Sequence, residues 1–237
     1  MKKVLSILIC GFLFWGCTDD TVGPIPTGNI AGTVKLNNTQ GNDFSGVSIR
    51  LDETTYSATS KSDGKWELSN VPAGIYKIVF SKPGYFTLKR YNFQFVGNGT
   101  YYYYSHTLAK VPSETVRQLN AQVIDSLESI FLYGTLSAAV QSEQSVIVFV
   151  SKSPLTNSIP IEAFDVTVFG ASIGQSEFSI YYHPVYNPNI TKGDTLYAIA
   201  YVGDLPYTGL YTNPITGLYE FDTPGVSLSN VVSFVVP

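Results

Sequence analysis

Few residues of this chain could perform acid–base or nucleophilic chemistry. The chain has 237 residues and only two histidines, His106 and His183, which lack both the HExxH spacing and the cysteine partners of common metal sites. Residues 170–174 read G-x-S-x-G around Ser172, but a serine-hydrolase elbow requires a strand that turns sharply into a helix, and no helix is predicted there. We therefore expect no enzymatic activity, no metal and no cofactor. A hydrolase acting through Ser172 is the less favoured alternative.

Tyrosine is the residue type with the clearest binding potential, and it occurs 17 times. In the run 101–104, alternate rings face opposite sides of a strand, so one pair is expected in the core and the other at the surface. A second group lies in or beside Pro- and Gly-rich loops, where a tyrosine offers a rigid apolar face and a hydroxyl to a glycan or a protein. The candidate ligand-binding residues are Tyr181, Tyr182, Tyr186, Tyr207, Tyr211 and Tyr219. The alternative is that these rings only pack within strands and cover sandwich rims.

The composition limits the classes of partner. Charged residues make up 14% of the chain, against about 25% in an average domain. The net charge of -4 excludes the basic surface that non-specific nucleic-acid binding needs, so no nucleic-acid partner is expected. The 20 Gly and 13 Pro, spread along the chain, favour short strands joined by turns over long helices.

The N-terminus reads as a targeting signal. Two lysines precede the apolar run 4–15, which is too short to span a bilayer but has the length of a signal-peptide core. The Gly-Cys pair that follows resembles a bacterial lipobox, which implies a signal peptide over residues 1–16 and a lipid on Cys17. Residues 17–27 would then be the lipidated cysteine and a polar tether. An ordinary secretory signal is the alternative.

Two further features bear on localisation. Asp19 and Asp20 resemble the acidic export signal of Bacteroidetes lipoproteins, which implies an outer-membrane lipoprotein with possible surface exposure. The other cysteine, Cys10, lies within the signal peptide, so the mature chain would carry no disulfide and no catalytic thiol. The membrane, reached through the lipid, is the first expected partner.

Residues 28–111 show the spacing of a small β-sandwich. Alternating apolar residues, as in residues 47–51, are separated by turn signals such as the Asp63-Gly64 pair. Five short motifs follow in order: GTV (32–34), SGVSI (45–49), TSKSDGKWEL (59–68), VPAGIY (71–76) and KPGY (82–85). Together they resemble the carboxypeptidase regulatory-like family, which implies a transthyretin- or prealbumin-like Ig sandwich and a non-catalytic unit.

Residues 112–237 are predicted to form a second sandwich. Residues 115–124 could be read as a helix, but we predict a strand because the surrounding sequence is β-like. Residues 193–201 resemble the fibronectin type III strand that carries a tyrosine corner, with Tyr197 as the matching tyrosine, and residues 229–236 resemble the closing strand. The fold class is therefore all-β, with two tandem Ig-like β-sandwich domains after a lipoprotein signal peptide.

These observations predict a non-catalytic, lipid-anchored cell-envelope protein. The first sandwich would act as a spacer, and the second would present a binding surface for a glycan or a protein. A structural or assembly accessory lipoprotein of a surface complex is the alternative function.

Overall fold

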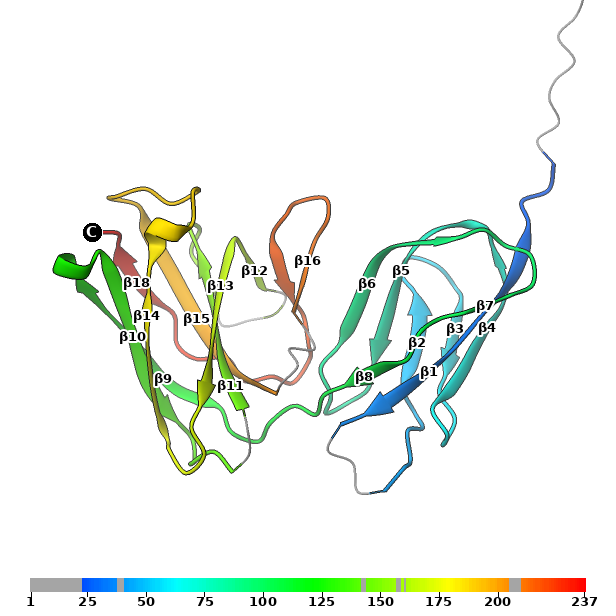
Figure 1. The fold of residues 1–237 in the computed structure, drawn as a ribbon, viewed down its shortest axis with the longest axis horizontal. Helices are drawn as coiled ribbons and strands as arrows, with labels where there is room; N and C mark the ends of the chain where they lie inside the picture. Colours follow the sequence, from blue (N-terminus) through cyan, green and yellow to red (C-terminus); the bar gives the residue numbers. More distant parts are fainter. Residues whose placement is uncertain (1–22, 38–40, 142–143, 157–158, 160, 205–209) are drawn as a thin grey trace, which may run out of the picture.

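The computed structural model describes residues 23–37, 41–141, 144–156, 159, 161–204 and 210–237. The predicted fold class is confirmed: these residues form two tandem β-sandwiches with only two short 3-10 helices (Figure 1). Within this part of the chain, no helix is long and apolar enough to cross a membrane. Cys17 and Tyr207 lie outside the described residues.

The N-terminal sandwich consists of two four-stranded sheets. One sheet contains β1 (Thr27–Leu36), β4 (Lys65–Pro72), β7 (Thr100–Tyr102) and β8 (His106–Leu108). The other contains β3 (Ser57–Thr59), β2 (Ser48–Leu51), β5 (Gly74–Ser81) and β6 (Leu88–Phe95). Strand β1 pairs with β4 on one side and with β7 and β8 on the other, so it forms the centre of its sheet.

Two of the predicted motif residues have clear structural roles in this sandwich. Gly64 has a φ of 80°, and a Cβ atom there would lie 2.2 Å from the Val34 carbonyl oxygen, so the turn requires glycine. The Tyr76 hydroxyl donates a hydrogen bond of 2.8 Å to the carbonyl oxygen of Pro72, which fixes the start of β5. Both roles agree with the expectation that the motif residues are structural.

Aromatic rings fill the centre of the N-terminal core. The Trp66 ring meets the Phe80 ring edge-on at 5.7 Å, and Tyr103 and His106 pack around Phe80. All four side chains are buried. The prediction that one pair of the tyrosine run is buried is wrong: Tyr103 is buried, whereas the other three tyrosines of the run are exposed.

The C-terminal sandwich packs a three-stranded sheet against a four-stranded one. The first sheet has the order β14 (Glu177–Tyr182), β10 (Ser129–Leu136) and β9 (Val116–Ile124). The second has the order β13 (Asp165–Ala171), β11 (Gln144–Ser151), β15 (Thr195–Asp204) and β18 (Val232–Val235). The strand predicted over residues 115–124 is therefore confirmed, and the helical alternative is wrong.

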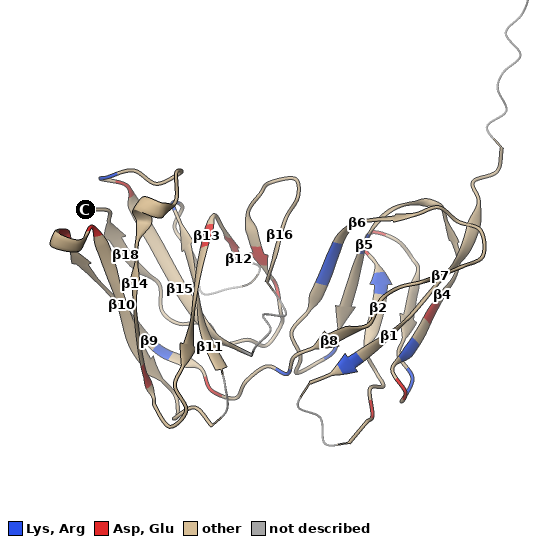
Figure 2. Cartoon of the chain, in the orientation of Figure 1, with Lys and Arg blue, Asp and Glu red and all other residues tan. Residues whose placement is uncertain are grey.

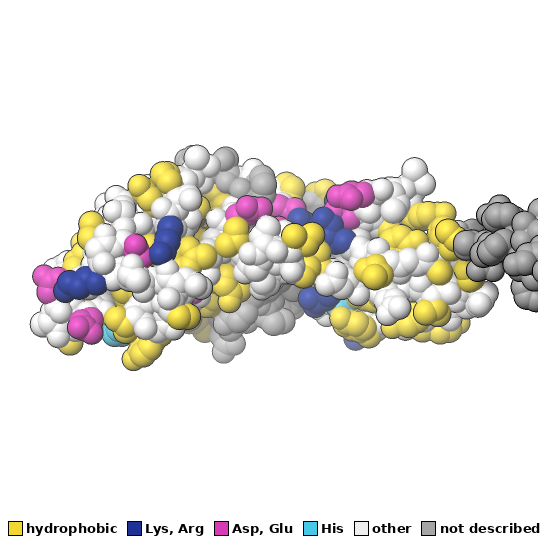
Figure 3. Space-filling view, turned by 90° about the horizontal axis from the view of Figure 1, so that it is seen from above, with side chains coloured by type: hydrophobic (Ala, Val, Ile, Leu, Met, Phe, Trp, Pro, Cys, Tyr) yellow, Lys and Arg dark blue, Asp and Glu magenta, His cyan; other side chains and the backbone are white. Residues whose placement is uncertain are grey.

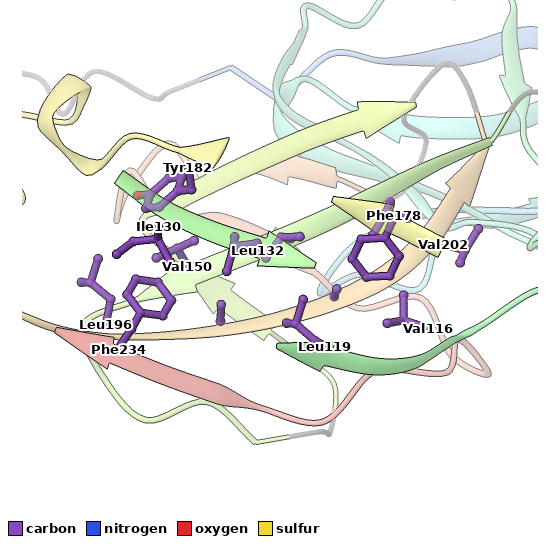
Figure 4. Packing of buried hydrophobic residues seen from close by; sticks show 14 of the residues in the cluster. Val116, Leu119, Ile130, Leu132, Val150, Phe178, Tyr182, Leu196, Val202 and Phe234 are labelled. Carbon is purple, nitrogen blue, oxygen red and sulfur yellow. The ribbon is translucent and has the colours of Figure 1, made fainter. Parts of the chain in front are cut away.

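The core of this sandwich is made by the alternate apolar residues of both sheets. Figure 4 shows Leu132 of β10, Leu119 of β9 and Val150 of β11 among the side chains between the sheets. Every residue of β11 is buried, because its other face is covered as well. The cover on that side includes a small third sheet of β12 (Ile161–Ala163), β17 (Tyr219–Phe221) and β16 (Leu210–Thr212). The 3-10 helices are η1 (Asp125–Leu127) and η2 (Pro184–Tyr186).

The two sandwiches share an apolar junction. Phe86 and Ala109 of the N-terminal half are buried in the same cluster as Phe149, Tyr201 and Phe221 of the C-terminal half. Phe86 lies 6.0 Å from the Tyr201 ring and 6.3 Å from the Phe221 ring, centroid to centroid. The sandwiches are therefore in direct contact through a core of their own.

Polar groups close the rim of this junction. Lys89 forms an ion pair with Asp222 and lies over the Tyr211 ring, 4.6 Å from its centroid. The Tyr91 hydroxyl donates a 2.7 Å hydrogen bond to Glu220. Basic side chains on the N-terminal half thus meet acidic ones on the C-terminal half, as the charge colouring shows (Figures 2 and 3).

Candidate functional site

Strand β10 separates apolar from aromatic side chains by simple alternation. Ile130, Leu132 and Leu136 are buried in the core, whereas Phe131 and Tyr133 point to the opposite face of the sheet. That face is not covered by the other sheet, so Phe131 is half-buried and Tyr133 is exposed. Strand β10 therefore presents two rings on the outside of the C-terminal sandwich.

The neighbouring strands β14 and β9 place further aromatic and polar side chains beside these two rings. Phe131 stands opposite Tyr181 on β14 and opposite Gln122 on β9. Tyr133 lies two residues further along β10 on the same face. It stands opposite Ser179 on β14 and opposite Asn120 on β9, so these three residues form a second row across the sheet. Each row thus combines aromatic rings with hydroxyl or amide groups.

The rings form one continuous surface, which we name the aromatic platform: Phe131, Tyr133, Tyr181, His183 and Tyr186. Centroid distances are 5.3 Å for Phe131–Tyr133, 5.0 Å for Phe131–Tyr181, 6.5 Å for Tyr181–His183 and 5.6 Å for His183–Tyr186. Tyr181 is 50% exposed and Tyr186 is 83% exposed, so their faces are open to a ligand.

A groove of about 660 Å³ runs along one end of the platform. Phe131 and Tyr133 line it together with polar residues of β9, β14 and the loop before β14, among them Asn120, Gln175 and Glu177. Such a groove places hydrogen-bond donors and acceptors beside an apolar floor, the usual composition of a site for a small polar ligand.

A second hollow of about 420 Å³ lies at the other end. It is lined by Tyr181, His183 and Tyr186 of the platform, and by Asp165 and Asn187. Asp165 is engaged within the protein, because it accepts a 2.7 Å hydrogen bond from the Tyr182 hydroxyl and another from the Val166 backbone N–H. Asn187 supplies a polar group at the rim of this hollow.

Tyr181 and Tyr182 are adjacent on β14 but differ in exposure. Tyr182 points from β14 into the core, as Figure 4 shows, while Tyr181 points outward. Burial raises the pKa of the Tyr182 hydroxyl well above its ordinary value, and the hydrogen bond to Asp165 raises it further. Tyr182 is therefore a neutral structural anchor for β14.

The structure separates the five tyrosines that it describes among the six selected from the sequence. Tyr181 and Tyr186 lie together on the aromatic platform, and Tyr182 lies beneath it. Tyr211 is buried at the junction, where its hydroxyl donates a hydrogen bond to Asp222. Tyr219 is half-buried in β17 of the small third sheet, away from the platform.

Burial and two carboxylates keep Tyr211 protonated. Burial raises the pKa of its hydroxyl far above the ordinary value, and the hydrogen bond to Asp222 and the nearby Glu220 carboxylate act in the same direction. With Lys89 over its ring, Tyr211 has both its face and its hydroxyl occupied by the protein. Its contacts are those of a residue that joins the two sandwiches.

The other chemically interesting residues lie in structural positions. His106 is 5% exposed, and burial lowers the pKa of its imidazole to about 4, with Arg90 contributing. Ser172 sits in the turn that joins β13 to β14, so its G-x-S-x-G sequence connects two strands and does not form a strand-to-helix elbow. Among the described residues, no group of three His, Cys, Asp or Glu side chains could hold a metal ion.

Sequence reasoning missed Phe131, Tyr133 and the polar residues that flank them. A usable signal was present: residues 130–136 alternate apolar and aromatic or polar types, and β9 alternates in the same way with Gln118, Asn120 and Gln122. What the sequence does not contain is the pairing register that places Phe131 beside Tyr181, fifty residues later.

Comparison with solved structures gave weak matches. A candidate carbohydrate-binding protein from Bacteroides uniformis matches 89% of this chain and 99% of its own, with 16% identity and a TM-score of 0.33. A DUF3823 family protein from Bacteroides ovatus matches 90% of this chain and 100% of its own, with 15% identity and a TM-score of 0.32. TM-scores this low establish neither a common fold nor a common function.

A type II cohesin–X-dockerin complex from Acetivibrio cellulolyticus matches a smaller part, 35% of this chain. The identity is 18% and the TM-score 0.33, and the match spans 58% of the other chain's length. Among curated proteins, none matches the chain.

The family comparison concerns the N-terminal sandwich. Residues 29–108 match the family model described as the carboxypeptidase regulatory-like domain. The match covers the five motifs that carried the resemblance, and the strands that those motifs form make the two sheets of this sandwich. This part of the resemblance is confirmed: residues 29–108 are a carboxypeptidase regulatory-like domain.

Proposed function

We propose that this chain is a non-catalytic, lipid-anchored envelope protein that binds a glycan on the aromatic platform of its C-terminal sandwich. The observation that carries the proposal is the continuous row of rings on an uncovered sheet face, flanked by amide and hydroxyl groups. Sugar rings have apolar C–H faces and polar edges, so such a surface offers both kinds of contact.

The charge around the platform supports a neutral sugar over a charged ligand. Strands β9, β10 and β14 contain only two charged residues, Arg117 and Glu177. Glu177 stands beside the groove, and Asp165 is already hydrogen-bonded to Tyr182. Neither a basic cluster for a phosphate nor an acidic cluster for a cation lies on this face among the described residues.

The shape of the face also favours an extended ligand. The rings follow one another along β10 and β14 and then onto η2, with one hollow at each end of the row. An oligosaccharide could stack on two or more rings in succession. A single monosaccharide would cover only one.

The glycan can be sought by titrating the full chain, purified from membranes in detergent, with cello-, xylo-, manno- and malto-oligosaccharides. We expect one class to bind, and we expect longer members to bind more tightly than disaccharides. The absence of binding to every class would contradict the sugar assignment. A pull-down from envelope that recovered a stoichiometric protein on the platform would favour a protein ligand.

The anchor is tested separately. Cys17→Ala should release the protein from the membrane fraction, because it removes the residue that would carry the lipid. A Ser172→Ala variant that abolished an esterase activity of the wild-type chain would contradict the non-catalytic assignment.

A further inference from the structure

The end of the N-terminal sandwich that receives the chain from residue 23 carries exposed apolar side chains. We name it the entry pole and define it by Ile25, Ile75, Val96 and Tyr101. Ile75 and Val96 are 71% and 69% exposed, which is unusual for aliphatic side chains on a domain edge. Figure 3 shows hydrophobic side chains gathered at this end of the molecule.

Hydrogen bonds bring these residues together. The Ala73 backbone N–H donates a 2.7 Å hydrogen bond to the Pro26 carbonyl oxygen, and the Asn98 N–H donates one of 3.0 Å to the Thr27 carbonyl oxygen. The incoming chain is thus held between the turn that precedes Ile75 and the turn that follows Val96.

Two further contacts define the rim of the pole. Ile75 pairs with Gln94 on β6, next to the segment that leads to Val96. Tyr101 packs edge-on against Phe93 of the same strand at 5.3 Å. The exposed apolar residues therefore lie around the point at which the chain enters the fold.

The same end carries little charge. Residues 23–31, 70–76 and 93–102, which build it, contain no Asp, Glu, Lys or Arg. Glu67, just outside these ranges, accepts a 2.6 Å hydrogen bond from Asn29. The opposite end of this sandwich is rich in charge, because it forms the polar rim of the junction (Figure 2).

We propose that the entry pole lies against the surface of the lipid bilayer, with Ile75 and Val96 inserted among the headgroups. This inference rests on the proposed lipid anchor at Cys17. Gly23 lies six positions after Cys17, so a fully extended chain between them reaches about 21 Å at most. Apolar side chains with little charge around them suit the boundary between headgroups and acyl chains, where buried apolar area adds to membrane binding.

This contact would set the orientation of the whole molecule relative to the membrane. The two sandwiches follow one another along the long axis, with the entry pole at one end and β9, β10 and β14 near the other (Figure 1). The junction core and its ion pair join them. A bilayer at the pole therefore leaves the aromatic platform facing away from the membrane.

The test uses the lipidated full chain in vesicles of phosphatidylethanolamine and phosphatidylglycerol. Residues 18–237 contain no cysteine, so a fluorophore that senses polarity can be attached at Thr100→Cys, beside the pole. The matched control is Ile215→Cys, whose native side chain is 91% exposed on the C-terminal half. We expect a blue-shifted emission and quenching by nitroxide-bearing lipids at position 100, and neither at position 215.

A second variant shows whether the pole itself makes the contact. Ile75→Asp combined with Val96→Asp should abolish the blue shift at position 100 while leaving the thermal unfolding midpoint unchanged, because both side chains are exposed. Equal emission at positions 100 and 215, or a blue shift that survives the two aspartates, would overturn the inference.

Vesicle flotation separates this inference from the anchor. If the wild-type chain floats but position 100 is not shifted, the pole contact is wrong and the anchor stands. If Cys17→Ala still floats, the anchor assignment is wrong. Loss of a cross-linked envelope protein in the double-aspartate variant, without any lipid contact in the wild type, would show that the pole binds a protein instead.

Discussion

In the N-terminal sandwich, Trp66 and Phe80 meet between the two sheets, and both are buried. In the C-terminal sandwich, Phe131 and Tyr181 meet at a similar distance but on the outer face of one sheet. The residue types are alike, and the centroid distances of 5.7 Å and 5.0 Å are close. The difference lies in which face of the sheet the strand register exposes, and that difference separates a packing role from the proposed binding role.

The largest expected effect on stability concerns the buried rings of the N-terminal sandwich. Trp66→Ala should lower the free energy of unfolding of the N-terminal sandwich by about 3–5 kcal/mol, because a large buried ring leaves a cavity. Chemical denaturation followed by circular dichroism measures it, because the substitution itself removes a tryptophan. Binding at the aromatic platform should persist wherever the variant remains folded. A loss below about 1 kcal/mol would contradict the role of Trp66 in the core.

The next largest effect is the pH dependence of the stability of the N-terminal sandwich, whose core contains His106. His106 has a pKa of about 4 in the folded chain, against 6.5 ordinarily, so the unfolded chain binds a proton first as the pH falls. Stability should therefore decline from about pH 6.5 to pH 4, with His106 contributing up to about 3 kcal/mol of that loss.

His106→Gln is the matched variant, because it cannot take up the proton. Denaturation at pH 7 and at pH 4 should show a smaller difference for this variant than for the wild type. The same slope in both chains would show that His106 does not titrate in this window.

A smaller loss of stability is expected when the ion pair at the junction is removed. Lys89→Ala leaves the Asp222 carboxylate, which is partly shielded from water, without its ion-pair partner. We expect a loss of about 1–3 kcal/mol in the free energy of unfolding, and we expect the two sandwiches to unfold at more widely separated temperatures. Scanning calorimetry measures both.

Lys152→Ala provides the control for that experiment. Lys152 pairs with Asp194 at 2.8 Å, but its side chain is 44% exposed, so this pair should contribute at most about 1 kcal/mol. Equal effects for Lys89→Ala and Lys152→Ala would mean that the junction pair behaves as an ordinary surface pair.

The smallest effect on stability belongs to the aromatic platform. Tyr186→Ala should change the free energy of unfolding by about 0.5 kcal/mol or less, since the ring is largely exposed. Thermal denaturation checks this. A large loss would show that Tyr186 packs within the protein and would weaken its assignment to a binding face.

Local patterns were enough to predict the fold class and the first domain. Alternation and turn residues such as Gly64 act over a few positions, and the motifs from residue 32 to residue 85 follow one another along one stretch of chain. The family match over residues 29–108 confirms that part.

The proposed binding face could be predicted only in part, because it depends on distant pairings. Tyr211 looked like a loop residue, yet it is buried by Lys89, more than a hundred residues earlier in the chain. Phe131 and Tyr133 were not singled out from the sequence, and their face is uncovered because the second sheet lies on the other side. Neither outcome can be read from neighbouring residues alone.

The central claim is that exposed rings of the C-terminal sandwich bind a glycan while exposed rings elsewhere do not. Calorimetric titration of the full chain with the oligosaccharide that binds most tightly tests it, using Tyr181→Ala combined with Tyr186→Ala. Tyr102→Ala is the control, because its ring is 79% exposed on the other sandwich. We predict at least a roughly tenfold weaker Kd for the platform variant, about 1.4 kcal/mol, and an unchanged Kd for Tyr102→Ala. Equal affinity in all three proteins would contradict the claim.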